Sequence, residues 1–393
     1  MKELFIYNSD DCDGIFLVED GILIEKYSDI NRKNRIEGNI YIGKVQNVVP
    51  GLQAAFIDIG EKKNAFIHLK DILPKIDSSI QNDIPDYNLL NIKDYVKQGM
   101  PILIEIKRDS YSQKGARAST HINLPGRLTV LLPNSTFITV SQKIDDESEK
   151  NRLKNIVRNF LPENMGAIIR TSAEKKSEKE IVNDLEILIN QWNKIISTKV
   201  SEENIPQIIF KNNDLINKIL RDLIDNGLDR IIVNTEEAKN RIGKVLEAFE
   251  KNDIEIEVKN EGILDIYQLN KRISDAENRK VWLKNGGFIT IDKTEALTAI
   301  DVNSGKYTGK DGLANTALTV NKEAAIEIAK QIRLRDIGGI IVIDFIDLIY
   351  DENRDEIINI FSKELKKDRS KIQIEGFTKL DLLELTRKHI CSN

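Results

Sequence analysis

The sequence predicts a multidomain α+β protein, and three observations lead to this prediction. Its 393 residues are enough for two to four domains at about 150 residues each. Short strands punctuated by glycine between 38 and 117 are typical of a small barrel, whereas strands and helices alternate from 205 onward. Hydrophobic residues make up 40% of the chain and charged residues 31%, which excludes a disordered protein.

Charge and cysteine content limit the partners and the compartment. The net charge is −5, so a nucleic acid would have to bind at a local basic patch. Two cysteines, Cys12 and Cys391, are too few for a disulfide framework or a four-ligand zinc site and suit a reducing compartment. The longest apolar run, 338–343, is far shorter than the ~20 residues that span a bilayer, and no export signal is visible. We therefore expect a cytoplasmic protein with no membrane partner.

The N-terminal third is expected to consist mainly of strands. Apolar and polar positions alternate over the first 35 residues, and this period-two pattern predicts a small antiparallel sheet. From Gly38 the strands become shorter and closer together, as in a small barrel. The strands expected in the barrel lie at 39–42, 45–49, 54–59, 65–68 and 102–106, with a long loop at 74–87.

Helices become frequent after a strand at 128–132. One amphipathic helix is ended by Pro162. The next is expected over 181–195, because Ser177 and Glu180 have the spacing of a capping box at its start.

The segment 205–278 is predicted to form a small α/β layer, because strands and helices alternate along it. The expected strands lie at 208–210, 231–233 and 254–258, and the expected helices lie at 215–223 and before 249.

The most regular pattern begins at residue 279. Strands at 288–291 and 296–300 predict a hairpin, and a helix with one apolar face follows. We expect Gly338 to end that helix in the left-handed conformation. The strand 340–343 is expected to be fully buried, because all four of its residues are apolar.

Two strands of this last segment end in acids, at Asp301 and Asp344, which are 43 residues apart. A strand, a helix and a second strand fit this spacing, so the two acids are expected at matching ends of neighbouring strands. Two carboxylates there suit Mg²⁺, and Asn303 would lie on the same side and orient Asp301. The alternative is that each aspartate caps a turn or pairs with a basic side chain.

Two nearby features carry weaker signals. Asp347 would point to the opposite face if the strand continued, so it is expected to be structural, or a neighbour of the metal if the strand ends at Asp344. The loop 304–311 is basic but does not match a phosphate-binding loop, so it can help hold a polyanion at most.

A positive stretch lies beside the predicted barrel. Residues 102–127 hold five basic side chains against two acidic ones. Together with aromatic faces, such a stretch suits single-stranded RNA, and Phe56 and Phe66 are the stacking candidates. The alternative is that both phenylalanines belong to the core. The five basic residues are Lys107, Arg108, Lys114, Arg117 and Arg127.

Longer motifs carry a family resemblance. Residues 43–69 resemble the OB-fold RNA-binding module first named in ribosomal protein S-one, with PGLQAAFIDIG followed by NAFIHL. The motif IDKTEALTAIDVN at 291–303 resembles the catalytic core of the ribonuclease E/G family. RLRDIGG at 333–339 and VIDFID at 342–347 resemble the same core, and the likeness extends essentially from end to end.

The resemblance implies a ribonuclease-H-like fold that is interrupted by an OB-fold barrel and a 5′-sensor region and followed by a deoxyribonuclease-I-like α/β catalytic domain. The implied boundaries are 1–37 and 205–278 for the ribonuclease-H-like fold, 38–117 for the OB-fold RNA-binding domain, 118–204 for the 5′-sensor region and 279–393 for the catalytic domain.

The resemblance also implies an Mg²⁺-dependent endoribonuclease that cleaves single-stranded RNA in rRNA and mRNA processing and turnover, stimulated by a 5′-monophosphate. A metal-activated water would attack the phosphodiester and leave 5′-phosphate and 3′-hydroxyl ends. The positions that match the family's functional residues are Asp301 and Asp344 for the metal, Asn303 beside them in catalysis, Phe56, Phe66 and Lys114 for RNA, and Gly126, Val130, Arg170 and Thr171 for the 5′-phosphate.

Two departures from the family pattern change these expectations. The Cys-Pro-x-Cys zinc link is absent before Asn393, so we expect a short form of the family with no structural zinc, and a homodimer would need other contacts. The pocket arginine expected before 372–374 is Lys371, which keeps the charge but loses the planar fork, so weaker 5′-end sensing is expected. Two rivals stay open: a non-catalytic RNA-binding scaffold, and a deoxyribonuclease suggested only by the carboxylate pair.

Overall fold

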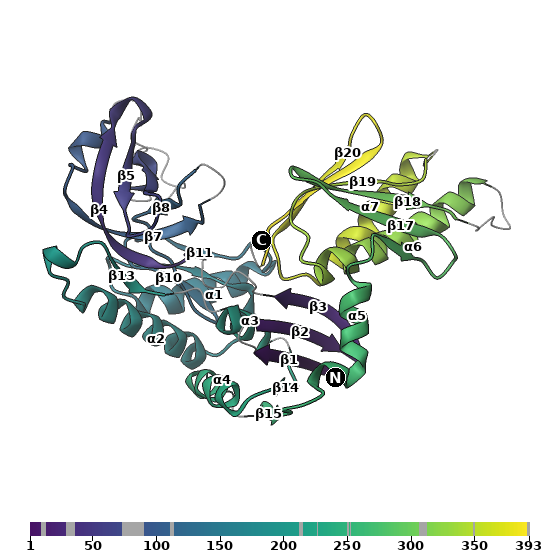
Figure 1. Ribbon diagram of the computed structural model, residues 1–393, viewed down its shortest axis with the longest axis horizontal. Helices are drawn as coiled ribbons and strands as arrows, with labels where there is room; N and C mark the ends of the chain where they lie inside the picture. Colours follow the sequence, from purple (N-terminus) through teal and green to yellow (C-terminus); the bar gives the residue numbers. More distant parts are fainter. Residues whose placement is uncertain are drawn as a thin grey trace. The chain divides into compact units, whose positions relative to one another are not determined.

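The chain folds into two compact units (Figure 1). We name residues 1–31 with 222–393 the terminal unit, and residues 32–221 the central unit. The division into five parts expected from the sequence is finer than this and stays a prediction. No helix in the described ranges is long and apolar enough to cross a membrane. The structure, a computed structural model, describes residues 1–8, 13–28, 36–72, 90–110, 114–211, 215–225, 227–249, 251, 253–305, 313–348 and 350–390.

A closed five-stranded barrel forms the first part of the central unit. β4 pairs with both β5 and β7, so the order β4-β5-β6-β8-β7 returns to its start. Its interior is filled by aliphatic side chains such as Val45, Ile57 and Ile104. This closed barrel is OB-like, and it confirms the small barrel predicted from the short strands. The strands are β4 (Ile40–Val49), β5 (Ala54–Asp58), β6 (Ala65–His68), β7 (Pro101–Arg108) and β8 (Arg117–Ser119).

The first strand of the barrel differs from the prediction of two separate strands. β4 is continuous, with an irregular register between Val45 and Asn47. A Cβ at Gly43 would lie 2.5 Å from Ile57 Cγ2, so this glycine permits β5 to pass closely. Gly43 therefore lies where two strands approach closely, and it does not form a turn between two separate strands. The long loop predicted at 74–87 lies outside the described residues.

The rest of the central unit is a four-stranded sheet packed against two helices. As predicted, α1 ends before Pro162, and α2 begins with a capping box between Ser177 and Glu180. Leu153 of α1 and Leu185 of α2 are fully buried in the core that the helices share with the sheet. In order across the sheet, the strands are β11 (Ile138–Val140), β12 (Gly166–Ile169), β10 (Thr129–Leu132) and β9 (Leu124–Pro125), and the helices are α1 (Glu147–Phe160) and α2 (Glu178–Ser197).

Distant parts of the chain form one five-stranded sheet in the terminal unit. β1 pairs antiparallel with β2 and parallel with β14, so the N-terminal strands and the segment near 230–258 share one layer. The strand predicted at 208–210 does not join this layer, because β13 (Gln207–Phe210) pairs with β4 of the barrel. The strand order is β15 (Glu255–Val258), β14 (Arg230–Val233), β1 (Lys2–Asn8), β2 (Asp13–Glu19) and β3 (Ile22–Ser28). The helices α4 (Glu236–Ala248) and α5 (Leu269–Asp275) belong to this unit, whereas most of α3 (Leu215–Leu223) belongs to the central unit.

A six-stranded sheet with two long helices makes up the rest of the terminal unit. The predicted hairpin is β17 and β18, and β18 is parallel to β19. Both helices pack on one face of this sheet, where Figure 1 shows them lying together. The strand order is β16 (Lys280–Trp282), β17 (Phe288–Lys293), β18 (Leu297–Asn303), β19 (Gly339–Asp344), β21 (Leu382–Arg387) and β20 (Ile372–Phe377); the helices are α6 (Leu313–Leu334) and α7 (Asp351–Leu365).

Two local predictions in this sheet are wrong. The strand at 340–343 is not fully buried, because the helices described for this sheet, α6 and α7, pack on one face of it and Ile340 is 50% exposed. Asp336, at φ +47°, adopts the left-handed conformation after α6, and Gly338 does not. A Cβ at Gly338 would lie 2.6 Å from the His389 ring, so the glycine is needed there for a close approach.

Candidate active site and RNA-contacting surfaces

The open face of the six-stranded sheet carries the two predicted carboxylates. Ile300 and Ile343 point to the helices and are buried, whereas the following residues, Asp301 and Asp344, are exposed on the other face. These two aspartates are register partners on the parallel strands β18 and β19. Because adjacent strands lie about 4.8 Å apart, the two carboxylates are side by side, as their positions after apolar strands predicted.

The carboxylate pair lacks a cationic partner among the described residues. Asn303 Nδ2 donates a hydrogen bond to Asp301 Oδ2 at 2.6 Å, which agrees with the orientation predicted for it. Partial desolvation raises the pKa of Asp344, and the negative charges of Asp301 and Asp347 raise it further. Among the described residues, therefore, neither aspartate has a basic partner of its own, and that alternative does not hold.

These residues suit a divalent cation held by few protein ligands. No cluster of three histidine, cysteine, aspartate or glutamate side chains able to hold a metal occurs in the ranges that the structure covers. Two adjacent carboxylates that repel each other would gain from a shared cation, and Mg²⁺ commonly takes one or two carboxylates and keeps water in its other positions. Asp301 and Asp344 would hold it.

Two further charged groups border the pair. β19 ends at Asp344, so Asp347 is not carried to the opposite face by a continuing strand; it is exposed and raises the pKa of Asp344. Arg279 donates two hydrogen bonds to Asp292, at 2.5 and 2.7 Å. The pair with Asp292, and more weakly the charge of Asp301, raises the pKa of Arg279. Most of the basic loop 304–311 lies outside the described residues.

Asn321 of α6 supports the site from the helix side, and the sequence analysis missed it. Its Nδ2 donates to the carbonyl of Ile346 at 2.7 Å, and its Oδ1 accepts from the N–H of Ile346 at 3.0 Å. Asn321 is fully buried. Both backbone groups of Ile346 thus have a partner just beyond Asp344, which fixes the chain between Asp344 and Asp347. Its only signal in the sequence is a polar residue on the apolar side of a helix.

The barrel brings the predicted RNA-contacting aromatics together. Phe56 and Phe66 are cross-strand partners on β5 and β6, with ring centroids 5.8 Å apart and planes at 68°. Both are partly exposed, whereas their neighbours along the strands are buried, so the alternative of core residues does not hold. Lys114 is exposed two residues before Ala116, whose carbonyl accepts from the N–H of Phe66 at 2.7 Å.

Fewer of the basic side chains in 102–127 are available to bind RNA than the composition of this stretch suggests. Lys107 pairs with Glu105 at 2.5 Å, and Arg117 pairs with Asp71 at 3.0 Å. Arg127 is 5% exposed and donates its backbone N–H to Asp184. Of the five cations, Arg108 and Lys114 are the two that are exposed and have no ion pair within the described residues. The count of charges along the sequence therefore overestimated the positive surface.

Three of the residues expected at the 5′-phosphate lie together in the central unit. Arg170 Nη1 donates to the carbonyl of Gly126 at 2.9 Å, and the hydroxyls of Thr171 and Ser141 are 2.9 Å apart. Thr171 follows Arg170 directly and is exposed. Val130 lies on β10, where it pairs with Pro125 of β9 and Ile168 of β12. Lys371 is exposed before β20 in the terminal unit, and its part in this pocket stays a prediction.

Asp184 of α2 holds the turn at Gly126 and Arg127, beside Arg170, and sequence reasoning did not find it. Its carboxylate accepts from the backbone N–H groups of Arg127, Leu128 and Thr129 at 2.8 to 3.0 Å, and from the Thr129 hydroxyl at 2.8 Å. A Cβ at Gly126 would lie 2.7 Å from Asp184 Oδ2, so only glycine fits there. Because Asp184 uses these N–H groups, a phosphate would have to bind the side chains of Arg170 and Thr171 instead.

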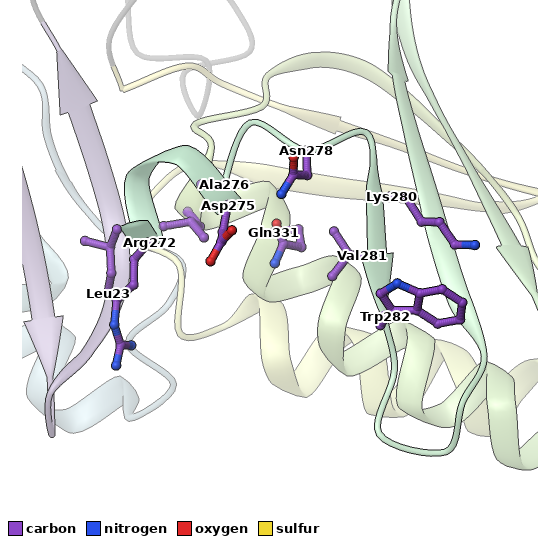
Figure 2. Close-up of a pocket in the computed structure, with 10 residues that line it drawn as sticks. Leu23, Arg272, Asp275, Ala276, Asn278, Lys280, Val281, Trp282 and Gln331 are labelled. Carbon is purple, nitrogen blue, oxygen red and sulfur yellow. The ribbon is translucent and has the colours of Figure 1, made fainter. Parts of the chain in front are cut away.

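A cavity of about 320 Å³ lies beside the edge strand β16 (Figure 2). Residues of β3, α5, β16 and α6 line it, including Arg272, Asp275, Lys280 and Gln331. None of the residues predicted for catalysis, RNA contact or 5′-phosphate binding lines this cavity. It is therefore not the candidate active site.

Comparison with known proteins agrees with the resemblance found in the motifs. The model of the ribonuclease E/G family matches residues 123–390. Ribonuclease G of Escherichia coli strain K12 is 37% identical over 374 residues, covering 94% of this chain and 76% of that protein. Ribonuclease G of Haemophilus influenzae is 38% identical over 377 residues (95% and 77%), and ribonuclease E of a Nostoc species is 36% identical over 359 residues (89% and 51%). With a family match over most of its length and relatives above 30% identity, the chain belongs to the ribonuclease E/G family.

Proposed function

We propose that this chain is an Mg²⁺-dependent endoribonuclease that cleaves single-stranded RNA in rRNA and mRNA processing and turnover. Membership of the ribonuclease E/G family and the names of the relatives support an endoribonuclease in RNA processing. The observation that supports metal dependence is the pair of register partners Asp301 and Asp344, which lie side by side on the open sheet face and form no ion pair with a basic side chain among the described residues.

The residues around the pair have distinct roles in this proposal. Asp301 and Asp344 hold the cation, and Asn303 fixes the rotation of Asp301 through its 2.6 Å hydrogen bond. A bound Mg²⁺ would supply positive charge that stabilises the transition state of the phosphodiester and lowers the pKa of a water. The open face admits a flexible single strand, and cleavage leaves 5′-phosphate and 3′-hydroxyl ends.

A 5′-monophosphate on the substrate stimulates the enzyme in this proposal. Arg170 can bind a phosphate through two parallel hydrogen bonds, and the exposed Thr171 hydroxyl adds a donor. The Gly126 carbonyl, which accepts from Arg170, holds the guanidinium in place. Phe56, Phe66 and Lys114 bind the strand on the barrel, with bases on the rings and a phosphate on the ammonium.

The decisive test exchanges the two acids for amides. Asp301→Asn and Asp344→Asn should each abolish cleavage of a 5′-monophosphorylated single-stranded RNA but leave RNA affinity nearly unchanged, because each removes one of the two carboxylate ligands. Glu384→Gln is the matched control, since Glu384 is an exposed acid of β21 on the same face and lies outside the pair. Mg²⁺ should raise the thermal midpoint of the wild type and of Glu384→Gln but not that of the two site variants. Cleavage retained in both site variants would refute the metal assignment.

The same assay separates the rival functions. A non-catalytic scaffold would bind the RNA and give no Mg²⁺-dependent product. A deoxyribonuclease would cut the matched DNA oligonucleotide at least as well as the RNA. Comparing 5′-monophosphate and 5′-hydroxyl ends on the same RNA tests the stimulation.

A further inference from the structure

An aromatic pair with a lysine stands exposed on the same sheet face as the carboxylate pair. Trp282 is 64% exposed, and its ring lies 5.4 Å from the ring of Phe288 at an angle of 63°. Lys280 Nζ lies 3.9 Å from the centre of the Trp282 ring and 3.5 Å from that of Phe288. Single exposed aromatic side chains are common on protein surfaces. Two neighbouring rings that share one ammonium group are a more specific arrangement, because the cation is attracted to the ring faces.

Strand register places this group next to Asp301 and Asp344. Lys280 pairs with Thr290, Thr290 with Asp301, and Asp301 with Asp344, so one row across four strands leads from the lysine to both carboxylates. Since each step is about 4.8 Å, the backbone of Lys280 lies about 10 Å from that of Asp301.

The aromatic pair forms the adjoining row. Trp282 pairs with Phe288, and Phe288 pairs with Asn303. Residues two apart on a strand share a face, so both rows lie on the open face. Figure 2 shows Lys280 and Trp282 on one side of β16 and Val281 on the other, toward Gln331.

The chemistry of this group fits a nucleotide. The face of the indole that Lys280 does not cover can stack on any base, and the ammonium on the other face attracts the phosphate that joins this base to the next. No anionic side chain pairs with Lys280 in the described part of the chain, so its charge is available to an incoming phosphate. A nucleotide stacked here would lie within reach of a phosphodiester at Asp301 and Asp344.

We propose that Trp282, Phe288 and Lys280 form a nucleotide-binding platform that holds the base and phosphate of a nucleotide flanking the scissile bond of single-stranded RNA. The platform adds a binding subsite to the proposed nuclease and rests on that function. It acts by stacking, so it accepts any base, and it favours a flexible strand over a duplex whose bases are already stacked.

Binding without metal tests the platform separately from cleavage. The full chain is titrated with a fluorescein-labelled single-stranded RNA in EDTA, so that the RNA is not cut. Trp282→Ala should weaken affinity about ten- to a hundred-fold, whereas Trp282→Phe keeps a ring and most of the affinity. Lys280→Gln should reduce the slope of log affinity against log salt by about 0.7, and Lys366→Gln, an exposed lysine that follows α7 on the helix side, should leave it unchanged.

The two tryptophans of the chain allow a second readout. Trp192 is 7% exposed in the core of the central unit, so Trp192→Phe leaves the exposed Trp282 as the only tryptophan. Saturating unlabelled RNA should quench the fluorescence of Trp282 in this variant. An abasic nucleotide moved along the RNA should weaken binding to the wild type at one position, and that position should have no effect on Trp282→Ala.

The outcomes separate the platform from the nuclease. If the wild type binds and, with Mg²⁺, cuts RNA, but Trp282→Ala binds equally well and Trp282 is not quenched, the platform is refuted and the nuclease proposal stands. If the wild type binds RNA but never cuts it, the nuclease proposal fails, and the platform loses its stated role. If Trp282→Ala instead converts a dimer to a monomer in sedimentation, a second copy occupies this face and the platform is refuted.

Discussion

A buried amide on α6 controls the chain next to the carboxylate pair. Asn321 satisfies both the N–H and the carbonyl of Ile346, two residues after Asp344. The Asn321 side chain lies next to apolar residues, because Val320 and Ala324 on the inner side of α6 belong to the hydrophobic core. The course of the chain after Asp344 therefore depends on a buried residue that lies outside the carboxylate pair.

We predict that Asn321→Leu lowers the free energy of unfolding by about 1–3 kcal/mol, because it leaves the buried N–H and carbonyl of Ile346 without partners. It should also reduce kcat more than it raises KM, since Asp344 loses its fixed position but the RNA-contacting residues are untouched. Urea denaturation and steady-state cleavage measure the two effects. Thr319→Val, exposed on the same helix, is the control, and an equal loss of activity in this variant would contradict the positioning role.

Residues with local signals were predictable, and residues with remote partners were not. Asp301 and Asp344 were found because each follows an apolar strand, and Asn303 because of its spacing. Asn321 and Asp184 bind backbone groups 25 and 55 to 57 residues away in the sequence. No spacing rule covers such contacts, so only the structure reveals them.

One helix fixes the turn that carries the proposed 5′-phosphate pocket. Asp184 of α2 accepts three backbone N–H groups between β9 and β10, and Arg170 follows β12, the next strand of the same sheet. The proposed pocket therefore depends on the packing of α2 against the connection between β9 and β10.

We predict that Asp184→Asn lowers the free energy of unfolding by about 2–3 kcal/mol, because an amide has one acceptor oxygen for donors that now bind a charged carboxylate. It should also abolish the preference for a 5′-monophosphate over a 5′-hydroxyl, while cleavage of the 5′-hydroxyl RNA persists. Chemical denaturation and paired cleavage assays check this. Glu186→Gln is the exposed control on the same helix, and an unchanged 5′-end preference in Asp184→Asn would contradict the role of the turn.

The ends of helices and strands could be predicted where the residues that decide them are close in the sequence. The capping box at Ser177 and the stop at Pro162 were predicted correctly, because the residues that decide them lie within one turn of the helix. The strand 340–343 was predicted to be buried on both faces and is not, since its composition does not say which faces of the sheet carry helices.

A buried ion cluster ties together the parts of the terminal unit. Glu25 of β3 is inaccessible to solvent and accepts a hydrogen bond from Tyr27 at 2.8 Å. Arg333 of α6 lies 2.6 Å from it, and Arg369, which precedes β20, lies 2.8 Å from it. The five-stranded and six-stranded sheets are thus joined by ion pairs in which one carboxylate serves two guanidinium groups.

We predict that Glu25→Gln lowers the free energy of unfolding by about 3–5 kcal/mol, because it removes the buried carboxylate that pairs with both Arg333 and Arg369. Circular dichroism during urea denaturation measures the change. Glu19→Gln, an exposed acid on the adjacent strand β2, should change stability by less than about 0.5 kcal/mol. Equal losses in the two variants would mean that the cluster does not stabilise the unit.

The sequence alone determined the class of the protein, most of its strands and helices, its family and the two acids at strand ends. These features rest on periodicity, turn residues and motifs, which are local because side-chain burial repeats every two residues in a strand and every 3.6 in a helix. Only the tertiary structure decided which strands share a sheet, which face stays open, and which cations are already paired. Strand pairing, the open face and the ion pairs depend on contacts between segments that are far apart in the chain. The energies of these contacts are set by packing and by charge pairing, which local sequence patterns do not predict.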